Sequence, residues 1–162
     1  MNLAHLHLIV NHAPLFGSLF ALPFLVFGVI RGDERAFRSG AILLVFASAG
    51  TALSLFSGDG AAEFVSERIP DGGLELRIRT HEDRADVAAA LTFAASLVAA
   101  AGSLRFKRVL SVGAAGLAAV AVVALALAAE AGGAIRHAEE VARCVQPTGD
   151  GGGSVNESAS KK

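Results

Sequence analysis

The apolar residues of this chain are concentrated in four long blocks, separated by shorter polar stretches. Glu130 is the only Asp, Glu, Lys or Arg inside these blocks, which cover residues 6–30, 41–56, 87–104 and 109–131. A helix needs about 20 residues to cross the hydrocarbon core of a membrane. The first and last blocks reach that length, and the middle two reach it with their polar flanks. The pattern predicts an all-α fold, a four-helix transmembrane bundle.

The overall composition supports a membrane protein. Hydrophobic residues make up 53% of the 162 residues, and the mean hydropathy is +0.54. We expect one membrane domain over residues 1–145, followed by a disordered tail over residues 146–162 that is rich in Gly, Ser and Lys. The Ala- and Gly-rich third and fourth blocks favour close helix packing, and their short connection predicts an antiparallel hairpin.

The polar segment between the second and third blocks carries several local signals. Residues 57–60, Ser-Gly-Asp-Gly, are typical of a helix breaker, and residues 61–69 suit a short surface helix. Residues 74–79 alternate apolar and polar side chains, which is typical of a strand, although no partner strand is evident. Thr80 fits the N-cap of a capping box, so the third helix is expected to begin at His81.

Basic residues in the two short loops predict the orientation. Three lie in the first loop and three in the last, namely Arg31, Arg35, Arg38, Arg105, Lys107 and Arg108. The positive-inside rule places these loops in the cytoplasm. Both termini and residues 58–86 are then expected on the periplasmic side of a bacterial inner membrane, in a multi-pass protein.

The remaining composition narrows the function. The formal net charge of −1 gives no nucleic-acid footprint, and the single cysteine, Cys144, excludes an intramolecular disulfide and a CxxCH site for covalent haem. The sequence offers no nucleophile–base pair or acid pair, so an electron-transfer or accessory role is favoured over an independent enzyme, without settling the question.

The histidines are the strongest lead to chemistry. Three stand at the start of the first apolar block, one before the third block and one after the fourth: His5, His7, His12, His81 and His137. Because consecutive membrane spans run in opposite directions, all five are expected at the same membrane face. Imidazole is the commonest metal ligand in proteins and carries protons near neutral pH. The depth of each histidine favours His12 with His81 as a ligand pair, with His7 and His137 as the alternative.

The neighbours of these histidines suit a haem. Gly133 lies one turn from His137, which would let a macrocycle approach the helix, and Glu130 lies on the same face as a candidate to orient a histidine or carry a proton. Arg84 and Arg136 are at the depth expected for partners of haem propionates.

Three short motifs resemble a known family. His7-x4-His12-x-Pro14 resembles the amino-terminal signature of a family of small bacterial four-helix membrane proteins of unknown function, which are suspected of binding haem b. Residues 132–137, Gly-Gly-Ala-Ile-Arg-His, resemble its signature at the end of the fourth helix, and His81 stands where the family has a histidine. The resemblance covers roughly residues 5–140 and implies that His7, His12, His81 and His137 act together. Leu8 departs from it, because many relatives have proline there.

Three functional hypotheses follow. The first is a b-type cytochrome-like electron-transfer protein with bis-histidine haem b near the periplasmic face, holding one haem or, if both histidine pairs ligate, two. It would exchange electrons with a redox partner, a larger membrane complex or quinone. The second is a non-haem accessory subunit of a respiratory or transport complex, surrounded by membrane lipids. The third is a periplasm-facing copper or zinc site, and the scarcity of Met and Cys lowers the odds of copper.

Overall fold

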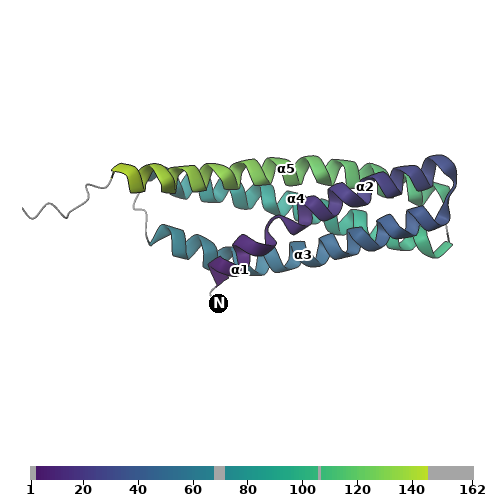
Figure 1. Cartoon of the computed structure of the whole chain (residues 1–162), viewed down its shortest axis with the longest axis horizontal. Coiled ribbons are helices and arrows are strands. Elements are labelled where there is room, and N and C mark those ends of the chain that lie inside the picture. The colour runs from purple at the N-terminus through teal and green to yellow at the C-terminus, as the bar shows by residue number, and fades with distance from the viewer. Residues whose placement is uncertain (1–2, 68–71, 106, 146–162) are drawn as a thin grey trace, which may run out of the picture.

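The protein folds into five helices that run along one long axis, four of which dominate the bundle (Figure 1). This computed structural model describes residues 3–67, 72–105 and 107–145. The helices are α1 (Leu3–Val10), α2 (Ala13–Arg31), α3 (Glu34–Ser66), α4 (Gly72–Arg105) and α5 (Arg108–Val145). The predicted tail, residues 146–162, lies outside the described residues.

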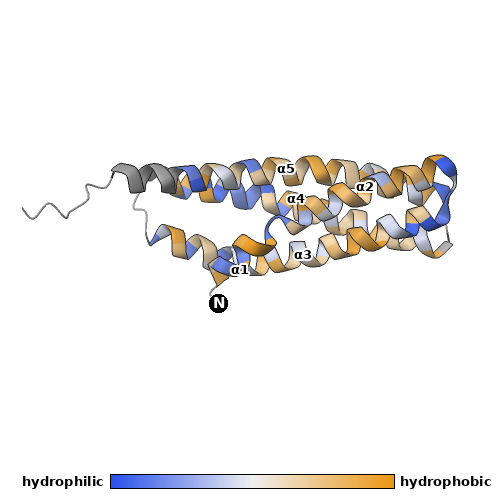
Figure 2. Ribbon diagram, in the orientation of Figure 1, coloured by the Kyte–Doolittle hydropathy of each residue, from blue (hydrophilic) through white to orange (hydrophobic). Residues whose placement is uncertain are grey.

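Four helical stretches are long and apolar enough to cross a membrane, which confirms the predicted number and type of spans. They are Leu3–Arg31, which combines α1 and α2, Glu34–Ser66, Gly73–Leu104 and Arg108–His137. Figure 2 shows that apolar residues line the middle of the bundle and that hydrophilic residues gather towards its two ends. The chain is therefore an all-helical, multi-pass membrane protein.

The helices pack as two antiparallel hairpins. The most extensive contacts join α4 to α5 and α2 to α3. The α4–α5 hairpin is the one that the short connection between the third and fourth apolar blocks predicted. Small side chains allow the approach: a Cβ at Gly28 would lie 2.7 Å from the backbone nitrogen of Phe37. The central core combines three large side chains with many alanines, and its buried members are Ala21, Leu25, Phe37, Ala41, Leu44, Ala95, Ala99, Ala114 and Ala118.

Phenylalanine side chains of α2 face outwards rather than into this core. Phe16, Phe20, Phe24 and Phe27 are between 46% and 61% exposed. In a membrane this stripe contacts lipid, so it forms no wall of an internal site.

Three predictions about the polar segment between the second and third apolar blocks are wrong. Residues 57–60 do not end a helix, because α3 continues to Ser66, and residues 74–79 are the first turns of α4 instead of a strand. Thr80 is not an N-cap: it lies inside α4, and its hydroxyl donates to the carbonyl of Leu76 at 2.7 Å. Packing overrides the local signals, since Leu3 of α1 covers Gly60 so closely that a Cβ there would lie 2.8 Å from the Leu3 Cβ.

The first span is interrupted at residues 11 and 12, where α1 ends and α2 begins. Proline occupies the first turn of α2, where its missing N–H costs no helical hydrogen bond. The interruption separates α1 from the axis of α2 and lays α1 against the carboxyl-terminal half of α3. In Figure 1, α1 therefore lies beside α3 at the end of the bundle where α4 begins and α5 ends.

Candidate functional site

Two histidines from distant parts of the chain meet between helices. The imidazole of His7 on α1 and that of His81 on α4 have ring centroids 6.5 Å apart, with an angle of 87° between the ring planes. Both side chains are partly buried. The contact joins one member of each ligand pair expected from the sequence.

His7 is oriented by α3. Its Nδ1 lies 3.1 Å from the carbonyl oxygen of Ser54 and 3.2 Å from the hydroxyl oxygen of Ser57. Ser57 is fully buried, and its hydroxyl donates to the carbonyl of Leu53 at 2.8 Å, so it can accept from His7. The ring lies over Gly58, where a Cβ would be 3.9 Å from the His7 Cε1, an ordinary van der Waals contact.

His81 is oriented by α5 in the same way. Its Nδ1 lies 2.9 Å from the carbonyl oxygen of Ala128. The ring covers Gly132, one turn further along α5, where a Cβ would lie 3.1 Å from the His81 Cε1. The absence of a side chain at position 132 therefore lets His81 reach the α5 backbone.

These contacts define the chemistry of both rings. A carbonyl oxygen only accepts hydrogen bonds, so the Nδ1 atom of each neutral imidazole carries the proton and Nε2 keeps its lone pair. Within the described ranges, neither Nε2 has a hydrogen-bond partner. Anchoring Nδ1–H on a carbonyl is how proteins commonly orient a histidine whose Nε2 binds a metal.

This donor set fits a haem iron. Haem supplies four nitrogen donors of its own and needs only two from the protein. His7 and His81 would supply these two donors, since their ring centroids lie 6.5 Å apart in an edge contact. Among the described residues there is no group of three or more His, Cys, Asp or Glu side chains that could hold a bare metal ion.

The other histidines lie outside this contact. His12 is exposed, where its Nδ1 contacts the Asn11 side chain and its ring stacks on Phe16 with centroids 6.4 Å apart. His5 on α1 and His137 on α5 are also exposed. The pairings His12–His81 and His7–His137 thus remain predictions, while the observed ring contact is His7–His81.

The remaining predicted site residues surround the α4–α5 contact. Arg84 donates to the carbonyl of Leu127 at 3.1 Å and faces Glu130 at 3.7 Å, in an exposed pair that stabilises the fold little. Arg136 is exposed. A Cβ at Gly133 would have no neighbour within 4 Å. The glycine that contacts His81 is therefore Gly132 and not the predicted Gly133.

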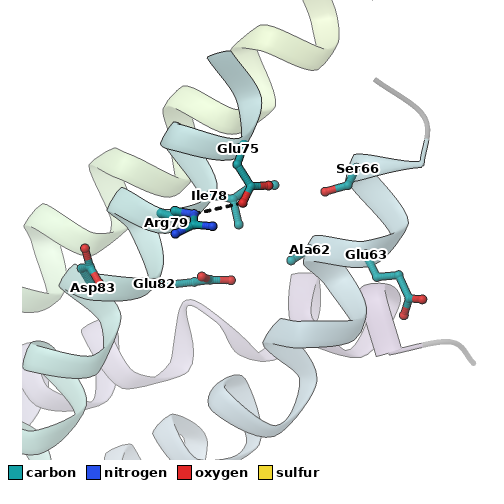
Figure 3. A pocket seen from close by; sticks show the side chains of 8 residues that line it. All are labelled: Ala62, Glu63, Ser66, Glu75, Ile78, Arg79, Glu82 and Asp83. Atoms are coloured by element: carbon teal, nitrogen blue, oxygen red, sulfur yellow. Dashed lines mark hydrogen bonds and ion pairs between the residues drawn. The ribbon is translucent and has the colours of Figure 1, made fainter. Parts of the chain in front are cut away.

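A cavity of about 420 Å³ lies between the end of α3 and the start of α4 (Figure 3). Four carboxylates line it, and its one basic residue, Arg79, donates to Glu75 at 2.9 Å. The lining residues are Ala62, Glu63, Ser66, Glu75, Ile78, Arg79, Glu82 and Asp83. Glu82 directly follows His81 in the sequence, but neither His7 nor His81 lines this cavity.

Sequence reasoning missed the groups that orient the pair, namely Ser57 and the backbone carbonyls of Ser54 and Ala128. Ser57 was assigned to a helix breaker, and backbone acceptors leave no signal in a single sequence. The chain matches no known family model, curated protein or solved structure.

Proposed function

We propose that this membrane protein binds one haem b between His7 and His81 and transfers single electrons. The observation that carries the proposal is the pair of carbonyl-anchored imidazoles whose ring centres lie 6.5 Å apart. Of the two cofactor hypotheses from the sequence, haem requires fewer protein ligands than a bare copper or zinc ion, and the described residues bring two imidazoles into contact and show no group of three or more metal-ligating side chains.

The residues of the chain have distinct roles in this proposal. His7 and His81 would hold the haem iron. The Ser54 carbonyl and the Ser57 hydroxyl hold the first ring, and the Ala128 carbonyl holds the second, which raises the basicity of both Nε2 atoms. Haem, when bound, supplies the reversible one-electron chemistry, while the protein sets its orientation and burial. Helices α3 and α5 thereby fix the ligand geometry.

The cellular setting is part of the proposal. Basic residues in the two short loops support a bacterial inner membrane with the histidine end in the periplasm. A redox partner or quinone would then exchange electrons at that end. Arg84 and Arg136 are retained as candidate propionate partners because both are exposed there.

The test is a visible absorption spectrum of the full-length protein, purified after expression with ample haem and recorded oxidised and dithionite-reduced. We expect a low-spin b-type spectrum and one haem per chain by pyridine extraction. His7→Ala and His81→Ala should each abolish or convert it, whereas His5→Ala should not.

Other outcomes choose between the hypotheses. Loss of the spectrum in His12→Ala, but not in His7→Ala, would restore the His12–His81 pairing. A wild-type protein without haem would favour the accessory-subunit hypothesis, and stoichiometric copper or zinc in its place would favour a metal site.

A further inference from the structure

The end of the bundle opposite the histidines brings together two basic loops. One joins α2 to α3, and the other joins α4 to α5. Arg38 connects them, because its Nε donates to the carbonyl of Ser103 at 3.3 Å. Figure 2 shows the hydrophilic residues that gather at this end. The basic residues of both loops therefore form one surface, which we call the basic end.

Most basic side chains that the structure describes at this end are unpaired. Arg38 forms an ion pair with Glu34, and the carboxylate of Asp33 accepts from two backbone N–H groups at the start of α3. Four exposed side chains have no hydrogen-bond or ionic partner in the described part of the chain: Arg31, Arg35, Lys107 and Arg108. Since both nearby acids are engaged, the surface keeps an excess of positive charge.

Large apolar side chains lie directly beside these cations. Ile30 is 72% exposed, Leu104 is 82% exposed and Val109 is 84% exposed. Ile30 precedes Arg31, and Val109 follows Arg108. Exposed apolar groups next to exposed cations suit the boundary of a bilayer, where the former reach acyl chains and the latter reach headgroups.

The opposite end of the bundle has the reverse charge. Its acidic residues include Asp59, Glu63, Glu67, Glu75, Glu82, Asp83 and Asp86, which outnumber the arginines nearby on α4, Arg77, Arg79 and Arg84. A negatively charged lipid is therefore attracted to one end of the molecule and repelled at the other.

We propose that the basic end binds the headgroups of anionic phospholipids, of which phosphatidylglycerol is the simplest example. Arginine presents a planar fork of donors that matches phosphate oxygens, and lysine adds a point charge. Basic clusters beside membrane helices gain about 1 kcal/mol per Lys or Arg at an anionic surface, which corresponds to about five-fold in affinity. The proposal does not depend on haem binding.

The test uses the full chain reconstituted into phosphatidylcholine bilayers that contain a trace of spin-labelled phosphatidylglycerol or phosphatidylcholine. Electron paramagnetic resonance gives the association of each lipid with the protein. We expect phosphatidylglycerol to be favoured several-fold at low salt, and the preference to shrink as salt rises. Arg35→Gln with Arg108→Gln should lower the preference towards the value that the wild-type protein shows at high salt.

A matched control removes two positive charges from the other end of the bundle, by Arg77→Gln with Arg79→Gln, and should leave the preference unchanged. The proposal is overturned if the wild-type protein shows no salt-sensitive preference for phosphatidylglycerol, or if both double variants lower it equally. The wild-type salt dependence decides the question even if a variant fails to fold.

Discussion

Gly132 and His81 touch across the α4–α5 interface. A Cβ at position 132 would lie 3.1 Å from Cε1 of His81 and 3.3 Å from its Nδ1, the atom that bonds to the carbonyl of Ala128. A contact this short requires the ring to move by a few tenths of an ångström. The orientation of the imidazole therefore depends on a glycine one turn from the carbonyl that holds it.

The first prediction uses two adjacent glycines. Gly132→Ala should displace the His81 ring from the Ala128 carbonyl and weaken haem retention, measured as haem per chain after purification. Gly133→Ala is the matched control, because a Cβ there meets nothing within 4 Å. If Gly133→Ala were instead the variant that lost haem, the macrocycle would lie against α5 as the sequence suggested.

The second prediction concerns the hydrogen bond between Ser57 and His7. Ser57→Ala removes one acceptor of the Nδ1 proton, so the imidazole donates less electron density to the ferric iron, and the midpoint potential should rise while haem is retained. Ser111→Ala is a control, because this buried serine also bonds to a backbone carbonyl, that of Lys107 just before α5, but lies at the other end of the bundle. Equal potentials in Ser57→Ala and wild type would argue against His7 as a ligand. Redox titration followed by visible absorption measures both variants.

The third prediction tests the α2–α3 hairpin without reference to any cofactor. Gly28→Ala places a methyl group 2.7 Å from the backbone nitrogen of Phe37, and backbone cannot yield as a side chain can. Overpacking of this kind costs about 1–3 kcal/mol, so thermal unfolding in detergent should shift down by several degrees. Gly116→Ala, which meets nothing within 4 Å, should unfold like the wild type. Identical unfolding of both variants would mean that these helices are further apart.

The fourth prediction tests orientation. Two variants in a Cys144→Ser background each carry one cysteine, in place of Arg35 or of Glu75. Both positions are exposed, and they lie at opposite ends of the bundle. A membrane-impermeant maleimide added to intact cells should label position 75 and not position 35. The reverse pattern would place the histidine end in the cytoplasm.

The four spans were predictable because a long apolar block without charged residues has few possible structures other than a membrane-spanning helix. The ends of the helices were not predictable from local rules. The alternation of residues 74–79 resembles a strand, yet Leu74 and Ile78 are one helical turn apart, and both are buried, against Ala62, Val65 and Ile135. The Arg79–Glu75 ion pair at the same spacing is the signal that favoured a helix.

The histidine end was predictable, but the contact within it was not. Treating residues 6–30 as one continuous helix put His12 nearest the membrane boundary. The interruption at residues 11 and 12 turns α1 towards α3, and His7 then meets His81. The packing of α1 against α3 determines which histidine meets His81. Counting residues along a single helix cannot reveal that packing.

The two imidazoles are held by different neighbours, His7 by α3 and His81 by α5. Helix α1 thus supplies one half of the pair, while the other half acquires its final orientation only when α5, later in the chain, has packed. If a ligand needs both rings in this orientation, its site is complete only once α5 has packed against α4. A chain truncated before Ala128 would lack the carbonyl that holds His81, and its site would be unfinished.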